Sequence, residues 1–330
     1  MTTMWMAGAE PRSRQIKPRS YRTEDDFWNM RQLLRRAMLA NAGFERSWHV
    51  ARLDYARWHS LFNCAKLTLQ DVVTLWEADG ELVAFILPDG ERGEAHFCFM
   101  SEVLTEGLAS EMLGAAEKSL ASVTPDGAHQ LEVWVDQHNA ILTEAVRAAG
   151  YQLQPWAERQ WHLDLAQDVP QPPMPAGYDI HPLGDGLELL ERCYASGLGF
   201  HNGDIATAVD NRSDPGWYRN IQKAPLYRRD LDLVAEAADG SIAAFCTLWF
   251  DDVTRTAYIE PVATVPAHQR RGLARALLTE GLRRLREMGA TRAFVSGYTD
   301  RANALYGSIM SPEPDLCQAW ARTWRARPQS

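Results

Sequence analysis

Two stretches of the chain share one pattern of apolar and polar positions. In residues 72–87, VVTLWEADGELVAFIL, two apolar runs separated by an Asp-Gly pair predict two strands joined by a tight turn. Residues 231–250, LDLVAEAADGSIAAFCTLWF, repeat this pattern. Phe85 and Phe245 hold equivalent places in the two stretches, 160 positions apart. Each stretch therefore predicts a β-hairpin of the same design.

Two further kinds of element recur in the same order. The apolar segments LEVWV (131–135) and TRAFV (291–295) predict equivalent strands, again 160 positions apart. A helix is expected before each strand, opening with GLASEML at Gly107 and GLARALL at Gly272. The second helix has an apolar stripe, formed by Leu273, Leu277, Gly281, Leu285 and Met288. These matches predict an internal duplication. The expected fold class is α/β (α+β), with two domains of one fold, each a mixed, mostly antiparallel sheet flanked by helices.

A proline-rich segment sets the expected domain boundaries. Residues 166–176, AQDVPQPPMPA, suit a semi-extended linker. We therefore expect one domain at 17–165 and a second at 177–330. Residues 1–16 lack the apolar core of a signal peptide, and we expect them to form a disordered lead.

Composition narrows the classes of partner. Hydrophobic residues make up 46% of the chain and charged residues 23%, which is ordinary for a globular protein. The net charge of −9 argues against nucleic acid and anionic membranes as partners. The five cysteines are scattered singly, with no CxxC pair and no metal-like histidine spacing. This predicts buried, reduced thiols in a cytoplasmic protein that binds no metal.

The stretch VATVPAHQRRGLARALL, residues 262–278, passes from an apolar strand through a basic loop into a helix. A glycine-bearing loop at a helix start points several backbone N–H groups at one spot, with the helix dipole behind them. Gly272 would let the backbone approach a ligand closely, and Arg270 or Arg271 could add positive charge at the rim. The pattern favours a pyrophosphate site, although a pair of arginines alone is more often a solvated helix start.

With this loop, the second half resembles the GNAT superfamily of acyl-CoA-dependent N-acetyltransferases, in their tandem-domain form. The loop of that family has the pattern Gln/Arg-x-x-Gly-x-Gly/Ala, which residues 269–274 match. The resemblance implies acetyl-CoA as the co-substrate. It also implies a preceding strand that is splayed from its neighbour and pairs with the pantetheine arm. The cofactor-binding residues it implies are Val262, Ala263, Thr264, Val265, Gln269, Arg270, Arg271, Gly272, Leu273, Ala274 and Arg275.

A second part of the resemblance lies in the segment DRANALYGSIM, residues 300–310. It is similar to the family's Asn-x-Leu-Tyr helix, whose tyrosine lies beside the CoA sulfur. The match implies that Tyr306 is a general acid and that Asn303 is a CoA-side or capping contact. The family usually follows this tyrosine with a Gly-Phe pair, whereas this chain has Met310, Ser311 and Pro312. The end of the helix and the rim of the acceptor cleft are therefore expected to differ.

A base is needed because only a neutral amine attacks a thioester. The family often keeps a carboxylate on the splayed strand, which implies that Glu260 is the catalytic base. On a regular strand the side chains of residues 258, 260, 262 and 264 would share one face. His201 and Asp204, in the segment GFHNGD, are lesser candidates for the same role.

The first half looks like a degenerate copy of the second. Aligning Gly107 with Gly272 places Glu106 at the position of Arg271, where a negative charge would repel a phosphate. The 160-residue offset places Val146 at the position of Tyr306. We therefore expect one CoA site per chain, in the second half.

Three functions are consistent with these features of the sequence. The leading one is an N-acetyltransferase that moves the acetyl group of acetyl-CoA to a primary amine of a small molecule, as a monomer or homodimer. The first alternative is an acyl-CoA-binding sensor or scaffold without turnover. The second is acetylation of protein lysines or N-termini, which the acidic net charge permits.

Overall fold

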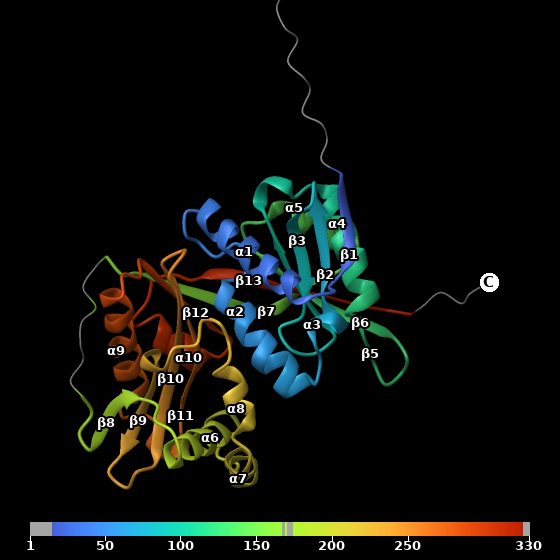
Figure 1. Cartoon of the computed structure of the whole chain (residues 1–330). Helices are drawn as coiled ribbons and strands as arrows, with labels where there is room; N and C mark the ends of the chain where they lie inside the picture. The colour runs from blue at the N-terminus through green and yellow to red at the C-terminus, as the bar shows by residue number, and fades with distance from the viewer. Residues whose placement is uncertain (1–14, 167–168, 170–173, 326–330) are drawn as a thin grey trace, which may run out of the picture.

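Figure 1 shows a computed structural model of the chain, which describes residues 15–166, 169 and 174–325. Most of the lead predicted over residues 1–16 lies outside the described residues, as does much of the linker predicted over 166–176.

The first half of the chain begins with a strand and helices and continues with strands that alternate with helices. In chain order its elements are β1 (Ile16–Ser20), α1 (Glu24–Ala40), α2 (Val50–Tyr55), the π-helix η1 (Ala56–Ala65), α3 (Leu69–Val72), β2 (Thr74–Ala78), β3 (Glu81–Leu87), β4 (Glu94–Phe99), the 3₁₀ turn η2 (Ser101–Val103), α4 (Glu106–Ser119), β5 (Ser122–Val123), β6 (His129–Asp136), α5 (Ala140–Ala148) and β7 (Gln152–Asp164).

The second half repeats this order. Its elements are β8 (Tyr178–Pro182), α6 (Leu187–Phe200), α7 (Ile205–Ser213), α8 (Gly216–Ile221), the 3₁₀ turn η3 (Arg229–Leu231), β9 (Asp232–Ala237), β10 (Ile242–Asp251), β11 (Thr256–Thr264), the 3₁₀ turn η4 (Pro266–His268), α9 (Leu273–Glu287), β12 (Arg292–Gly297), α10 (Asp300–Tyr306) and β13 (Asp315–Trp324).

Both predicted hairpins are present, as β2–β3 and β9–β10. Asp79 and Gly80 have φ values of 54° and 83°, so both central residues of the first turn are left-handed. This conformation matches the twist of a two-residue hairpin, which is why the Asp-Gly pair is a reliable turn signal. The predicted helical stripe is also present, since Leu273, Leu277 and Leu285 are buried on α9.

The strands of both halves join in one mixed, mostly antiparallel sheet. Its order is β1-β2-β3-β4-β6-β13-β7-β12-β11-β10-β9-β8, with β5 paired to β6 off this path. The last strand of each half pairs with the other half, because β13 lies between β6 and β7, and β7 pairs with β12. Figure 1 shows β7 and β13 crossing between the two lobes. The fold class is as predicted, but the two expected sheets are continuous. The division into domains at 17–165 and 177–330 therefore stays a prediction.

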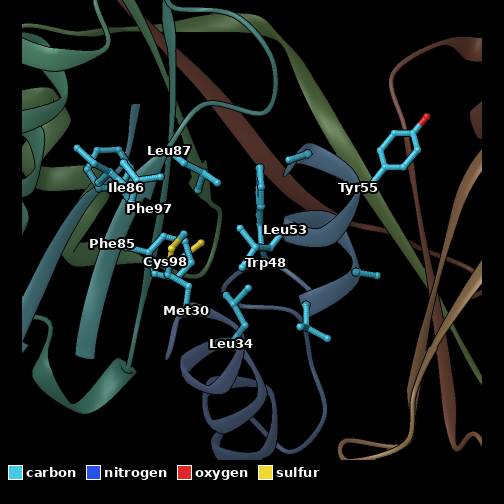
Figure 2. Close-up of a cluster of buried hydrophobic side chains, with 14 of the residues drawn as sticks. Met30, Leu34, Trp48, Leu53, Tyr55, Phe85, Ile86, Leu87, Phe97 and Cys98 are labelled. Carbon is cyan, nitrogen blue, oxygen red and sulfur yellow. The ribbon is translucent and has the colours of Figure 1, made fainter. Parts of the chain in front are cut away.

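The apolar core also runs across both halves. Figure 2 shows part of it, where α1 packs on β3 and β4 through Met30 and Phe85, and Leu53 of α2 joins the same cluster. The same buried cluster continues to Phe245 and Trp249 on β10. A second cluster lies between the sheet and α9. Because one core spans both halves, their relative placement is fixed by packing.

Buried ion pairs also link the two halves. Arg35 on α1 donates two hydrogen bonds to Asp251 on β10, at 2.6 and 2.9 Å. Arg52 on α2 donates to both carboxylate oxygens of Glu158 on β7, at 2.7 and 3.2 Å. The aspartate and glutamate are fully buried, so these pairs are shielded from solvent screening.

The cysteine prediction is wrong at one position. Cys98, Cys193, Cys246 and Cys317 are buried free thiols, but Cys64 at the end of η1 is exposed. Within the described ranges, no helix is long and apolar enough to cross a membrane. In the same ranges no group of three His, Cys, Asp or Glu side chains is arranged to hold a metal ion.

Candidate active site

β11 and β12 separate partway along their length, at what we call the slot. The two strands pair in parallel only from Thr256 to Tyr258, although β11 continues to Thr264 and β12 to Gly297. On its other edge β11 stays paired with β10 through Val262, Ala263 and Thr264. Val265 then donates its N–H to the carbonyl of Ala243. The outer edge of residues 262–264 therefore faces the slot and has no strand beside it, which is the geometry expected for a strand that pairs with an extended ligand.

The slot leads to the loop that begins α9. Arg270 and Gly272 have left-handed φ values of 64° and 82°. No described residue accepts a hydrogen bond from the backbone N–H groups of Arg270, Arg271 or Gly272. Gly272 is also the N-cap of α9 and supplies no side-chain cap, so the first N–H groups of the helix are open as well. Together these amides form a concave donor site that suits a phosphate.

The basic residues of this loop have different surroundings. Arg271 donates to the hydroxyl of Tyr178 at 2.8 Å, and that hydroxyl also bonds His268. Arg275 donates to the hydroxyl of Ser308 after α10 at 2.7 Å. Arg270 is exposed and forms no ion pair with a described residue. In this state Arg271 and Arg275 hold the loop in place, while Arg270 is free to approach a ligand.

The two remaining loop residues also support its shape. The side chain of Gln269 donates to the carbonyl of Thr264 at 3.3 Å, which ties the loop to the end of β11. Leu273 is buried in the core below the sheet, and Ala274 is partly buried. Leu273 therefore anchors the first turn of α9, while its backbone remains at the open helix start.

Tyr306 ends α10 beside this slot. Only 7% of the residue is exposed, and its ring lies next to Gly297, where an added Cβ would come within 3.2 Å of it. Its hydroxyl makes no hydrogen bond to a described residue. Burial raises the pKa of Tyr306 well above its usual value, and the nearby Cys246 and Glu260 act in the same direction. The phenol is therefore protonated at neutral pH.

Asn303 has a different place from the capping contact that was expected. Thr299 is the N-cap of α10, and its side chain accepts from the N–H of Ala302. Asn303 is buried, and its side-chain oxygen accepts a 2.9 Å hydrogen bond from the indole of Trp161 on β7. The capping role predicted for Asn303 is thus wrong, and a CoA contact stays a prediction.

Glu260 lies in an irregular part of β11. The register with β10 shifts between Cys246 and Leu248, where two residues of β11 oppose one of β10. Because of this bulge, Val262 shares a face with Ile259 and lies opposite to Tyr258. The predicted common face of residues 258, 260, 262 and 264 is therefore wrong.

The environment of Glu260 is strongly acidic. Burial raises the pKa of Glu260 to about 8, and the charge of Asp89 adds to the effect, while Arg52 opposes it. Glu158 and Glu45 raise it further. A carboxyl group with this pKa is a stronger base than an ordinary glutamate, and it titrates near neutral pH.

The two lesser candidates for the base, Asp204 and His201, both lie at helix ends. Asp204 is the N-cap of α7 and accepts from the N–H of Ala206 and the hydroxyl of Thr207. His201 is the exposed C-cap residue of α6. Between them, Gly203 lies against Pro266 at the start of η4. This loop therefore lies on the side of the predicted phosphate site.

The sequence analysis missed a set of charged residues from the first half. Arg52 is their centre: besides Glu158, it lies 3.6 Å from Glu45 and 3.5 Å from Asp89. Its guanidinium also stacks on Tyr258 of β11, at 5.7 Å from the ring centroid. These residues lie on separate segments and form no local motif, so only the packing of α2 against the second half brings them to Glu260.

In the first half the slot equivalent to that between β11 and β12 is filled. β4 and β6 pair only from Glu94 to His96 and then separate. The segment before α2 covers the edge of β4 beyond this pair, because the Ser47 hydroxyl donates to the carbonyl of Phe99 at 3.0 Å and accepts from its N–H at 3.2 Å. The indole of the next residue, Trp48, donates to His96 at 3.2 Å. The cavity left beside them measures only about 30 Å³. This is room for about one water molecule and not for a pantetheine arm.

The helix that follows this filled slot also lacks an open N-terminus. Thr105 is the N-cap of α4, and its hydroxyl accepts from the N–H of Leu108 at 3.2 Å. Glu106 adds a negative charge to the first turn. Val146, which occupies the position equivalent to Tyr306, is fully buried. The first half therefore satisfies its own helix start and leaves no cationic rim for a phosphate.

Comparison with known proteins agrees with this geometry. Residues 204–310 match the Acetyltransferase (GNAT) family. A GCN5-related N-acetyltransferase from Sphaerobacter thermophilus is similar over 96% of this chain and 98% of its own, with a TM-score of 0.63 and 17% identity. A tandem GNAT protein from the clavulanic acid biosynthesis pathway is similar over 96% and 100%, with a TM-score of 0.64 and 15% identity. No significant match was found among curated protein sequences. At these identities the likeness shows the fold alone, which is the GNAT fold.

The amide site makes Gly272 the most sensitive residue of the loop. A Cβ at this position would meet no atom closer than Pro175 Cγ at 4.0 Å, but it would project from a left-handed backbone. We expect Gly272→Val to weaken CoA binding at least about tenfold, or about 1.4 kcal/mol, in calorimetric titration. Gly107→Val on α4 is the matched control and should leave CoA affinity unchanged. Unaltered affinity in Gly272→Val would contradict the loop assignment.

The filled slot of the first half predicts the binding stoichiometry. We expect calorimetric titration of the full chain with CoA to saturate at one molecule per chain, because Ser47 and Trp48 cover the edge of β4 at the second position. Two equivalent sites would refute the interpretation of the first half as a degenerate copy. A single site lost in Gly107→Val but kept in Gly272→Val would place the cofactor in the wrong half.

Proposed function

Because residues 204–310 match the Acetyltransferase (GNAT) family, we propose that the protein moves the acetyl group of acetyl-CoA to a primary amine of a small molecule. The observation that carries the proposal is the open edge of β11, which runs directly into the amide site at Gly272. Val262, Ala263, Thr264 and Val265 would pair with the pantetheine arm, and the amides of residues 270–274 would hold the pyrophosphate. We also propose that the protein is cytoplasmic and acts as a monomer or homodimer.

The reaction needs two proton transfers. The amine nitrogen attacks the thioester carbonyl carbon, a C–N bond forms, and the C–S bond breaks. The attacking nitrogen loses a proton to Glu260, directly or through water, and the departing sulfur receives a proton from Tyr306. The products are the amide and free CoA.

Glu260 is suited to the base role by its surroundings. Its raised pKa of about 8 makes the carboxylate a stronger proton acceptor than an exposed glutamate. The surplus of carboxylates near Arg52 also gives this end of the site a negative potential, which attracts an ammonium group before it is deprotonated.

Tyr306 is suited to the acid role because burial keeps its phenol protonated. In water, transfer from a tyrosine to a thiolate of pKa about 8.5 is uphill. Burial raises the pKa of a thiol in the same way, as it does for the neighbouring Cys246, whose pKa lies far above its usual value. In a closed site burial therefore raises both pKa values and does not by itself make the transfer more uphill than in water.

Two alternatives differ in what they require of these residues. An acyl-CoA-binding sensor needs the amide site but neither Tyr306 nor Glu260. A protein N-acetyltransferase needs a cleft that admits a peptide. A screen of small amines and peptides with acetyl-CoA, followed by free thiol release, separates the three functions. Turnover with small amines supports the proposal, whereas CoA binding without any turnover supports the sensor.

Tyr306→Phe tests the general acid, since it removes the phenol oxygen and little volume. We expect kcat to fall by roughly 10²–10⁴-fold, while CoA affinity stays within about twofold because the phosphate site is distant in sequence and separately held. Steady-state kinetics and calorimetry measure the two quantities. Normal turnover would leave Tyr306 as a core residue only.

Glu260→Gln tests the base through the pH dependence of kcat/KM. The raised pKa means that Glu260 is protonated and inactive as a base below about pH 8, so wild-type kcat/KM should rise with pH through this region. In Glu260→Gln this rise should be lost or displaced, with the same amine used for both proteins so that its own titration cancels. Identical profiles would move the role to another group, with His201 and Asp204 next in line.

A further inference from the structure

Arg192 on α6 is a buried cation without a hydrogen-bond partner. The residue has no exposed surface, and its Nε, Nη1 and Nη2 atoms make no hydrogen bond within the part of the chain that the structure describes. The guanidinium lies over the rings of Phe245, at 3.3 Å from the centroid, and of Tyr218, at 4.7 Å. Two π faces stabilise the charge, but they satisfy none of its five N–H donors.

Asp232, a buried carboxylate that also contacts Tyr218, is already satisfied by other groups. Asp232 accepts hydrogen bonds from the hydroxyls of Tyr218, Tyr227 and Thr247, at 2.7 to 3.0 Å. None of the guanidinium nitrogens of Arg192 donates to it. Arg192 thus has no carboxylate partner, while Asp232 accepts hydrogen bonds from neutral hydroxyl groups. An arrangement of this kind is costly in an empty protein, because a buried charge without a partner is strongly disfavoured.

The first half shows how the chain treats a buried arginine that serves only the fold. Arg31 on α1, the helix at the same place in the element order, is also buried. It donates two hydrogen bonds to Asp54, at 2.9 and 3.1 Å. Arg31 and Arg192 are therefore both buried, but only Arg31 has a carboxylate partner.

A positively charged groove lies close to Arg192. It has a volume of about 640 Å³ between η1 and α8, and its charged lining comprises three cations and one anion: Lys66, Arg219, Lys223 and Asp214. Its wall includes Trp217, which contacts both Tyr218, at 5.3 Å, and His59, at 5.6 Å. In a chain of net charge −9, this groove would concentrate anions.

A row of aromatic rings connects this region to Glu260. The ring of His59 lies 4.9 Å from that of Tyr55, and Tyr55 lies 6.0 Å from Trp249. The indole of Trp249 donates to the carbonyl of Glu260 at 2.6 Å. Figure 2 shows Tyr55 pointing away from the core of the first half, toward the strands of the second. The cationic region and the acidic region thus lie at the two ends of one row of packed aromatic rings.

We propose that Arg192 binds an anionic group of the acceptor, a carboxylate, while the amine of the same molecule reaches Glu260 at the other end of this row of rings. The acceptor is accordingly an amino acid or another amine that carries a carboxylate. Because Arg192 has no exposed surface, the ligand reaches it when side chains of the groove wall, Trp217 first, move aside. That the bound anion is part of the acceptor rests on the proposed function, whereas the anion site itself rests on Arg192 and its surroundings alone.

Anion-dependent stability tests the site without any turnover. The free energy of unfolding is measured in denaturant with sodium propionate, sodium phosphate or sodium chloride at equal ionic strength. Propionate should stabilise the wild type more than chloride does, because a ligand that binds only the folded state adds to its stability. Arg192→Met should lose this response. Arg212→Met, which removes an exposed arginine on α7 that pairs with Glu191, should keep it.

Three results of this experiment would overturn the proposal. The first is an equal response to propionate in the wild type and in Arg192→Met. The second is a response to phosphate alone, which would contradict the carboxylate. The third is a marked loss of stability of Arg192→Met in chloride, similar to that expected for Arg31→Met, which leaves Asp54 unpaired. Arg192→Met should instead be at least as stable as the wild type in chloride, and Arg192→Lys should restore part of the propionate response.

The kinetic test uses pairs of amines of equal chain length, an ω-amino acid and the corresponding alkylamine. The wild type should prefer the amino acid by at least about tenfold in kcat/KM at the best length, and Arg192→Met should lose that preference while Arg212→Met keeps it. An unchanged preference in Arg192→Met would contradict the proposal. If no amine is acetylated, the proposed function fails, and the propionate experiment still decides whether Arg192 binds a carboxylate.

Discussion

The pairing of β13 with both β6 and β7 fixes how the two halves of the molecule lie against each other. Each half sends its last strand to the other, so the backbone hydrogen bonds at the centre of the sheet join residues from both ends of the chain. The two halves cannot then rotate past one another, and α2 is held against β11. This is what allows Arg52, a residue of the first half, to lie among the carboxylates that surround Glu260 in the second.

The same supersecondary design has two different outcomes in one chain. In both halves a parallel strand pair separates after three residues and a helix begins beyond the gap. In the second half β11 keeps an unpaired edge, and the helix begins at a left-handed glycine with unsatisfied amides. In the first half Ser47 and Trp48 cover the free edge of β4, and Thr105 caps the helix. A site is kept or lost through a few side chains, while the backbone design is retained.

Charge is distributed unevenly along the row of aromatic rings that runs from His59 to Trp249. Near Glu260 there are more carboxylates than cations, and near Arg192 there is a cation with no carboxylate of its own. Neither end is favourable for folding by itself, because each leaves charge that the protein does not balance. Such arrangements are retained where a ligand supplies the missing charge.

The sequence by itself determined the repeat, the hairpins and the loop at Gly272, because each depends on local features: the period of apolar residues, the Asp-Gly turns, and a glycine that tolerates a left-handed backbone. Tyr306 and Glu260 were found through a family pattern in consecutive residues. Only the tertiary structure decided the exchange of β7 and β13, the bulge that reorients Val262, and the grouping of Arg52, Glu45, Asp89 and Glu158. The isolation of Arg192 was equally invisible in sequence, since a missing partner is a property of everything packed around a side chain and has no local pattern.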